Sequence, residues 1–448
     1  MRHLINKLTF EALCADDSSA FEVRHNFSKF CQYQLADMME AICTKYSSED
    51  QWIRIERLEI NIGKINPANF EKSLRSALYA GLEKEFNTRI CSFSGDQRTI
   101  PNGAAAFELI IYFLQNGVLP WWAEGSEIDI DKKCFEVLNN QPDSLRNFLF
   151  EHRSEKVIWE RLSLQFTTEA RNRIVYLFDE LIAMERKMLQ HEKAISLAFK
   201  ELNFTYQSPD IARQLILQNA PYIFSDDIVI KDSLVNDFFE KLSSKIYKKT
   251  GDSKQEDFIK NDSVIPVREE LFKNPELQDH DSSKRYFVKY AGVVIVFPFI
   301  KALFSETKLI TDGEWTNAEC RNQAIHLLRY ISTGQQETPE YDLVLEKLFC
   351  GVAIDEPVPR KITLTGNEIA EAHAVLRSVI EHWIVLKNTS IDALRATFLQ
   401  RDGVIVKKDD GWLLQVERKT EDVLLESIPW GYSTISLPWN QYLIHVEW

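Results

Sequence analysis

The hydrophobic period of the chain changes twice between its two ends, and this change limits the fold more than any other feature. Apolar residues alternate at every second position within residues 52–62 and 442–448, but recur every third or fourth position through most of the sequence between them. Period two is typical of strands and period 3.6 of helices. The sequence therefore predicts an α+β fold, mainly α, with strands near both ends.

The first 90 residues are expected to form a strand-helix-strand-helix unit. Residues 3–10 and 52–62 have strand character, with a bulge expected at Glu56 and Arg57. Ser19 and Glu22 have the spacing of a capping box, and Pro67 is placed to start the second helix. The helical rows are Phe27, Cys31, Leu35, Met38 and Ile42, then Phe70, Leu74, Leu78, Leu82 and Phe86.

Residues 104–242 are predicted to be helical, with one long helix over about 168–203. Two interleaved sevenfold series give it a heptad seam, whose main positions are Ile174, Leu177, Leu181, Met184, Met188 and Ile195. Such a seam suits a coiled coil of about 50 Å, and also a helix buried within its own chain. Both readings stay open, with internal packing favoured over self-association.

Three further segments complete the predicted domain order. Residues 243–284 are polar and nearly aperiodic and are expected to be a flexible insertion or linker, and residues 285–402 form a second helical region. Residues 403–448 predict a β-hairpin about Asp409-Asp410-Gly411 and a terminal strand. Strands thus return only at the C-terminal end.

Charge and hydropathy exclude some classes of partner. The net charge of the 448 residues is −14, which removes the general attraction to nucleic acid. The longest uncharged apolar run, residues 290–300, is far shorter than the roughly 20 residues of a membrane span. The seven cysteines show no paired spacing. We expect a protein made in the cytoplasm, with no nucleic-acid partner and no membrane span.

The sequence contains no recognisable motif for catalysis, for cofactor binding or for a metal site. Neither a phosphate-binding glycine loop nor a nucleophile elbow occurs. His373 and His382 are nine residues apart on a predicted helix, on opposite faces, and cannot share a metal there. Glu127, Asp129 and Asp131 lack the glycine and glutamate of a calcium loop and are interpreted as acids at a helix start. We expect no catalytic, cofactor-binding or metal residues.

Tryptophans beside prolines are the remaining unusual feature. An aliphatic residue followed by Pro-Trp occurs three times, in Leu119-Pro120-Trp121-Trp122, Ile428-Pro429-Trp430 and Leu437-Pro438-Trp439. The last residue of the sequence is Trp448. Large rings beside a fixed φ suit packing corners and equally protein interfaces. Trp121, Trp122, Trp430, Trp439 and Trp448 are therefore candidate interaction or structural corners.

Several stretches together resemble the tape measure protein family of contractile injection systems, phage-tail-like particles that include the antifeeding-prophage type. They are "WIRIERLEINIGKI", "GVLPWWA", "YAGVVIVFPFIKALF", "NQAIHLLRYISTGQQETPEYDLVLEKLFCG" and the tail "GWLLQVERKTEDVLLESIPWGYSTISLPW" with its final "VEW". These words keep their order over nearly the whole length of the chain.

The resemblance implies a non-enzymatic structural protein that helps to assemble the tube and sheath from the baseplate, or sets their length. Its partners would be tube, sheath or baseplate proteins, with self-association through the long helix as an option. Its place would be the cytoplasm during assembly, with incorporation in the particle left open. The alternative function is a baseplate- or effector-binding adaptor without a ruler role.

Overall fold

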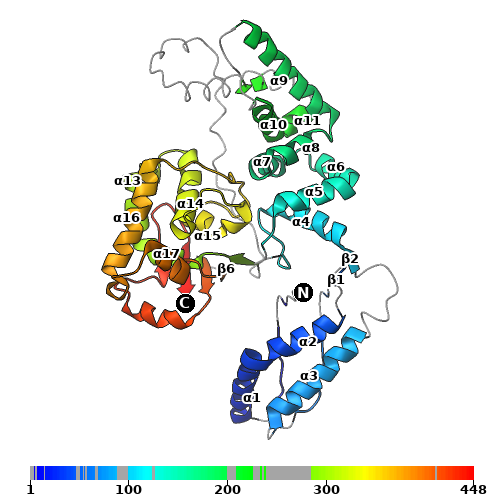
Figure 1. The fold of residues 1–448 in the computed structure, drawn as a ribbon. Coiled ribbons are helices and arrows are strands. Elements are labelled where there is room, and N and C mark those ends of the chain that lie inside the picture. The colour runs from blue at the N-terminus through cyan, green and yellow to red at the C-terminus, as the bar shows by residue number, and fades with distance from the viewer. Residues whose placement is uncertain are drawn as a thin grey trace. The chain divides into compact units, whose positions relative to one another are not determined.

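The computed structural model describes residues 5, 8–14, 16–46, 51–53, 55, 58–65, 69–87, 99–123, 127–198, 208–225, 233–234, 237–238, 284–408 and 411–448 (Figure 1). They fall into two compact units, Met1–Leu109 and Ile110–Trp448. Each unit has a hydrophobic core of its own. The mainly α, α+β class is confirmed, while the finer division into five segments stays a prediction.

Helices α1 to α3 dominate the first unit. A π-helical turn, η1 (Cys31–Leu35), joins α1 (Asp17–Phe30) to α2 (Ala36–Tyr46), and α3 (Phe70–Phe86) packs against both. The buried side chains fall largely on the predicted helical rows; they are Phe30, Leu35, Met38, Ile42, Phe70, Leu74, Leu82 and Phe86. Spacing alone thus located this helical core.

The predicted strands of the first unit need correction. Residues 5 and 8–10 form no strand, and the Phe10 ring instead stacks on Phe27 with centroids 3.9 Å apart. In the second predicted strand, β1 (Gln51–Ile53) pairs antiparallel to β2 (Thr99–Pro101), and residues 55 and 58–62 are not assigned as strand. Alternation records that one face is buried and does not guarantee a hydrogen-bonded neighbour. The bulge predicted at residues 56 and 57 lies outside the described residues.

The start of the first helix also differs from the prediction. Asp16 is the N-cap, and its carboxylate accepts a hydrogen bond of 2.7 Å from the Ser19 backbone N–H. Ser19 is therefore already helical. Asp16 and Ser19 are both residue types that suit an N-cap, and the earlier one starts the helix. Pro67 lies outside the described residues, and α3 begins after Asn69.

A series of helices opens the second unit. Their bounds are α4 (Asn102–Asn116), which begins in the first unit, α5 (Ile130–Asn140), α6 (Pro142–Glu151), α7 (Lys156–Gln165), α8 (Thr168–Val175), α9 (Asp179–Ala198), α10 (Ser208–Gln218) and α11 (Ala220–Phe224). Helix α10 packs against α7, α8 and α9. Gly117 follows α4 with φ 71°, as its position at the predicted helix end requires.

The single long helix predicted over residues 168–203 is wrong. The chain leaves the helix at Tyr176 and re-enters it at Asp179, so α8 and α9 are separate. Phe178 turns inward against the Trp159 and Phe224 rings, at centroid distances of 5.9 and 5.3 Å. Arg146 donates a 3.0 Å hydrogen bond to the Leu177 carbonyl oxygen. Aromatic burial and this bond offset the lost helical hydrogen bonds, which heptad spacing cannot reveal.

The C-terminal part of the second unit resumes at β3 (Arg285–Val288) and continues with mixed helices. They are η4 (Ala291–Val296), α13 (Phe297–Glu306), α14 (Ala318–Thr333), η5 (Glu340–Asp342), α15 (Val344–Phe349), α16 (Gly366–His382), η6 (Ile384–Leu386), α17 (Ile391–Leu394) and η7 (Arg395–Leu399). A small pair, β4 (Ile310–Thr311) and β5 (Glu314–Trp315), follows α13. All six residues of η4 are buried, as expected for an apolar run too short for a membrane.

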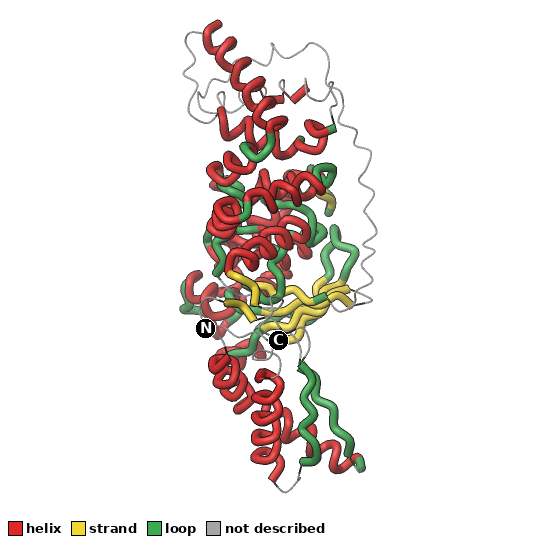
Figure 2. Tube along the Cα trace, turned by 90° about the vertical axis from the view of Figure 1, so that its right-hand side faces the viewer, coloured by secondary structure: helices red, strands yellow, loops and turns green. Residues whose placement is uncertain are grey.

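A five-stranded sheet closes the chain (Figure 2). The predicted hairpin is confirmed as β6 (Gly403–Lys408) and β7 (Gly411–Val416), and the terminal strand as β9 (Leu443–Glu447). The strand order is β3-β6-β7-β9-β8, where β8 is Thr434–Ile435, and β7 and β9 run parallel. The parallel pair requires the crossover through η8 (Thr420–Ser427) and the last two proline corners.

The helices and the sheet of the C-terminal part share one core. It contains Val294, Leu328, Phe349, Leu414 and Ile444, all of them fully buried. Gly292 permits a close approach here, because a Cβ at that position would lie 1.7 Å from the Phe398 carbonyl oxygen. Within the described ranges no helix is both long and apolar enough to cross a membrane.

Candidate functional site

Three of the five predicted tryptophan corners lie at the end of the chain, and their rings contact their own protein. Trp430 donates from its indole nitrogen to the Ile295 carbonyl oxygen at 3.0 Å and meets Phe299 edge to face. Trp439 donates to the Phe349 carbonyl oxygen at 2.9 Å, with its ring centroid 5.3 Å from that of Phe304. Both indole N–H groups are thereby satisfied.

The terminal Trp448 is docked as well. Its indole nitrogen donates to Asp422 at 3.1 Å, and Arg418 donates to its backbone oxygen at 3.3 Å. Trp121 and Trp122 form a turn after α4 and are half-buried. The structure thus places all five rings at least partly inside the second unit, and it gathers only the C-terminal three around the sheet and its helices.

A buried ion cluster, Arg161–Glu340–Lys347, is the most distinctive polar feature of the second unit. Glu340 begins η5, Arg161 lies on α7 and Lys347 on α15, and all three side chains are at most 1% exposed. Arg161 binds both carboxylate oxygens of Glu340, at 3.0 and 3.2 Å, and Lys347 binds one of them at 2.7 Å. The cluster joins segments about 180 residues apart in sequence.

The single Glu340 carboxylate pairs with two cations in this cluster. Backbone carbonyl oxygens therefore accept the remaining hydrogen bonds of the two positive groups. The Lys347 ammonium donates to the Ile354 and Glu356 carbonyl oxygens at 2.8 and 2.7 Å. Arg161 also donates to the carbonyl oxygens of Leu114, in the last turn of α4, and of Asp355. Helix C-terminal carbonyls carry partial negative charge and favour a cation. Burial lowers the pKa of Lys347, and Glu340 opposes this shift.

Contacts around the cluster extend the same junction. The Gln165 side chain on α7 accepts from the Glu340 backbone N–H at 2.9 Å and donates to the Val358 carbonyl oxygen. Gly117 sits against the cluster, because a Cβ there would lie 2.5 Å from a Glu340 oxygen. The early helices and the C-terminal part therefore meet through buried polar contacts with little room for change.

Asp131 provides a second link at the start of α5. Its carboxylate accepts from the Thr167 backbone N–H at 2.9 Å and pairs with Arg360. The preceding acid, Asp129, caps α5. The prediction that the acids at 127–131 mark a helix start is confirmed for Asp129, while Asp131 has the additional role of an ion-pair partner.

Another buried pair, Arg329 and Glu346, joins α14 to α15 at 3.0 Å. Burial raises the pKa of Glu346, and the Arg329 guanidinium opposes that rise. Arg329 also lies 4.4 Å over the ring of Tyr290, which has a left-handed backbone with φ 61°. Such a conformation is costly for a tyrosine, and the cation–π contact helps to hold it.

Catalytic or metal chemistry finds no support among the described residues. No group of three or more metal-ligating side chains occurs in those ranges. His373 contacts the Tyr330 hydroxyl, whereas His382 bonds the Ser378 carbonyl oxygen in its own helix. The two histidines serve different neighbours, in line with their predicted separation.

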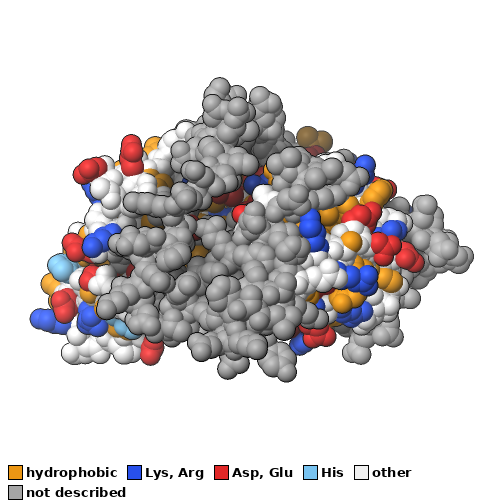
Figure 3. Space-filling model, turned by 90° about the horizontal axis from the view of Figure 1, so that it is seen from above, with side chains coloured by type: hydrophobic (Ala, Val, Ile, Leu, Met, Phe, Trp, Pro, Cys, Tyr) orange, Lys and Arg blue, Asp and Glu red, His pale blue; other side chains and the backbone are white. Residues whose placement is uncertain are grey.

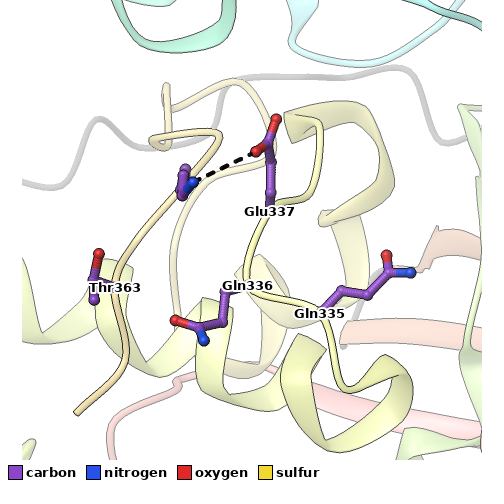
Figure 4. Close-up of a pocket in the computed structure, with 5 residues that line it drawn as sticks. Gln335, Gln336, Glu337 and Thr363 are labelled. Carbon is purple, nitrogen blue, oxygen red and sulfur yellow. Dashed lines mark ion pairs between the residues drawn. The ribbon is translucent and has the colours of Figure 1, made fainter.

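The surface hollow at the end of α14 does not resemble an active site either. It is lined by Gln335, Gln336, Glu337, Lys361 and Thr363. In Figure 4 the labelled glutamine side chains point away from each other, and the marked ion pair joins Glu337 to Lys361 at 3.9 Å. A ligand site needs polar groups that point toward one bound molecule, and Gln335 and Gln336 do not do so.

Charge is mixed on the part of the surface where Figure 3 shows described residues. In the view of Figure 3, acidic and basic side chains of the described residues alternate with apolar ones and form no large patch of one sign. This matches the absence of a basic stripe in the sequence.

Sequence reasoning missed the buried ion cluster. Its signal was weak: Arg161 interrupts the apolar run "VIWERLSL", and Glu346 and Lys347 interrupt "DLVLEKLF". Charged residues are almost never fully buried without a partner, so charges on the buried face of a short apolar helix hint at ion pairs. Which residues pair across about 180 positions is visible only in the fold.

Comparison with known proteins identifies a family. The family model described as "contractile injection system tape measure protein" matches residues 2–448. No curated protein and no solved structure matches the chain. The match covers almost the entire chain, including the first unit, the buried ion cluster and the tryptophan-rich end. The chain therefore belongs to the family of contractile injection system tape measure proteins.

Proposed function

We propose that this chain works as a folded assembly component of a contractile injection particle, binding tube, sheath or baseplate proteins, and not as an extended ruler. The observation that carries the proposal is the Arg161–Glu340 contact, which folds residues 179 positions apart onto each other. A ruler needs a chain whose length is laid out along the tube. Buried ion pairs oppose such extension, because separating them exposes or strands charge.

The helices support the same choice. The longest helix in the described ranges, α9, has 20 residues and spans about 30 Å. The helix that carries the heptad seam is interrupted at residues 176–178. We place the protein in the cytoplasm during assembly, and its binding surfaces on the exposed faces of the two units.

Deleting the gene and imaging the particles tests the assembly role. We expect far fewer complete particles, because a component that builds the tube and sheath is missing. Particles of normal number and length would refute both the assembly and the length-control versions. Restoring the gene on a plasmid is the control.

Changing the length of residues 243–284 separates assembly from measurement. If the chain were a helical ruler, removing 30 residues would shorten the tube by about 45 Å. An assembly component predicts unchanged length, measured on negatively stained particles. A tube that becomes shorter with the chain would contradict our proposal and favour the ruler.

Co-purification tests the alternative function, an effector-binding adaptor. If this chain co-purifies with cargo proteins but never with tube or baseplate proteins, the adaptor is favoured.

A further inference from the structure

Two short 3₁₀ helices near the end of the second unit carry exposed aliphatic side chains. In η6, Ile384 is 75% exposed and Val385 is 52% exposed, and in η8 Val423 is 65% exposed. The two helices touch, and the buried Trp383 indole at the start of η6 donates to the Ser427 hydroxyl of η8 at 2.9 Å. Their outward side chains therefore belong to one surface, and we call Ile384, Val385 and Val423 the apolar patch.

The geometry of the 3₁₀ helix gives each half of the patch a charged neighbour. Side chains three positions apart in such a helix lie above one another. Val423 and Glu426 are both exposed in η8, whereas Leu425 is buried in the core. Ile384 and Lys387 have the same spacing at η6 and are also both exposed. An anion thus lies beside one half of the patch and a cation beside the other.

These two charges are available to a partner. Neither Lys387 nor Glu426 makes an ion pair in the part of the chain that the structure describes. Asp422 of η8 differs from them, because it pairs with the buried Arg401 at 3.0 Å. The charges beside the patch therefore have no role in holding their own helices.

The size of the patch indicates what could cover it. Three aliphatic side chains exposed to this degree offer on the order of 300 Å² of apolar surface. The smallest specific protein interfaces bury about 600 Å² on each partner, and a little over half of that area is apolar. The patch therefore has about the apolar area that one side of a small dimer interface needs.

We propose that the apolar patch is the centre of a two-fold contact with a second copy of this chain. A two-fold axis between η6 and η8 sets Val423 of one copy against Ile384 of the other. The same axis brings Glu426 of one copy to Lys387 of the other, and it does so twice. Opposite charges then meet at both edges of the patch, which selects this arrangement over contacts that leave them unmatched. The contact goes beyond the assembly function and belongs to the isolated protein.

The molecular mass in solution, measured by light scattering on the full-length protein, tests the contact. We expect the mass to rise from one chain towards two as the concentration increases to about 100 µM. Val423→Asp should weaken this association by about tenfold or more, because it places a charge in the apolar centre. Val157→Asp is the matched control, since Val157 is an exposed valine on α7, and it should leave the association unchanged. A protein that stays monomeric, or a dimer that Val423→Asp does not weaken, would overturn the proposal.

Charge reversal tests the two-fold arrangement. Glu426→Lys and Lys387→Glu, each alone, should weaken the dimer roughly tenfold, because like charges then face each other at both edges. The two changes together should restore the native affinity, because each pair forms again with its signs exchanged. Single changes without effect, or a double variant that stays as weak as the single ones, would rule out this arrangement.

Two checks keep these outcomes distinct. Circular dichroism shows whether each variant folds, and if Val423→Asp does not, the charge-reversal series decides. If the isolated protein stays monomeric while Val423→Asp lowers its recovery with tube or baseplate proteins, the patch binds another particle protein and the second copy is wrong. If gene deletion leaves particles normal while the dimer forms as expected, only the assembly function fails.

Discussion

At the scale of single residues, Glu340 has the largest consequence for this fold. It lies between Arg161 and Lys347 with no exposed surface, and its backbone N–H is bound by Gln165. A buried pair adds little stability relative to an apolar core, but removing one partner strands the other charge. The cluster therefore specifies which segments meet more than it adds to the net free energy of folding.

Glu340→Gln should lower the free energy of unfolding by about 3–5 kcal/mol, because it leaves two buried cations without an anion. Urea unfolding followed by tryptophan fluorescence measures this. Glu136→Gln is the control, since the Lys133–Glu136 pair at 2.8 Å is partly exposed and should be worth less than about 1 kcal/mol. Similar losses in the two variants would contradict the role assigned to Glu340.

His326 predicts a pH dependence of stability. Burial lowers its pKa to about 4 from an ordinary 6.5, with Arg329 adding to the shift, and its Nε2 bonds the Pro359 carbonyl oxygen at 2.7 Å. Between these two pH values the unfolded chain binds a proton that the folded chain excludes. Stability from this group is therefore complete above about pH 6.5 and decreases as the pH falls to about 4.

His326→Gln keeps a side-chain N–H donor for Pro359 but does not titrate. The loss of unfolding free energy between pH 6.5 and 4 should be smaller in this variant than in the native protein, by up to about 3 kcal/mol. Urea unfolding across that pH range gives both values. An identical pH dependence would show that His326 is not excluded from protonation by the fold.

At the scale of elements, the heptad seam shows what periodicity can and cannot predict. Ile174, Leu181 and Met188 are fully buried, Met184 is nearly so, and Leu177 is half-buried in the break between α8 and α9. The side chain of Ile195 lies outside the described residues. Most seam positions whose side chains are described are therefore buried, but spacing did not show that Phe178 would interrupt the helix.

Met188→Ala tests whether the seam is used within the chain or between chains. Met188 is fully buried, and α9 packs on α10 and α11. We therefore expect the free energy of unfolding to fall by about 2–5 kcal/mol and the molecular mass in solution to stay unchanged. Light scattering and urea unfolding measure the two quantities. Tyr176→Ala, at a residue 57% exposed, is the control and should change stability by only about 0.5 kcal/mol. A change in mass without a loss of stability would indicate self-association.

At the scale of the whole molecule, the second unit is held together by contacts between its early helices and its C-terminal part. Phe113 meets Tyr341 edge to face at 5.9 Å, and the Tyr341 hydroxyl donates to the Ile128 carbonyl oxygen at 2.6 Å. Burial raises the pKa of Tyr341, so this hydroxyl stays a donor. These contacts and the ion cluster join residues on both sides of positions 239–283.

Cutting the chain between these sides should not separate them. With a protease site engineered between residues 251 and 283, the two cleaved fragments should elute together in size exclusion, because the apolar and ionic contacts remain. The same cut in a Glu340→Gln protein is the control and should release more free fragment. Separate elution of the native fragments would show that the chain connection, and not the interface, holds the unit together.

The sequence by itself determined the class of the fold, most helix positions in the described ranges, the hairpin at 403–416 and the family. Periodicity, caps and turn residues act over a few positions, so a single stretch of sequence carries them. The tertiary structure decided the break at residues 176–178, the parallel pairing of β7 with β9 and the partners of Arg161, Glu340 and Lys347. It also decided that Trp439 and Trp448 face their own chain. Those outcomes depend on which distant side chains exclude water together, and no local pattern records that choice.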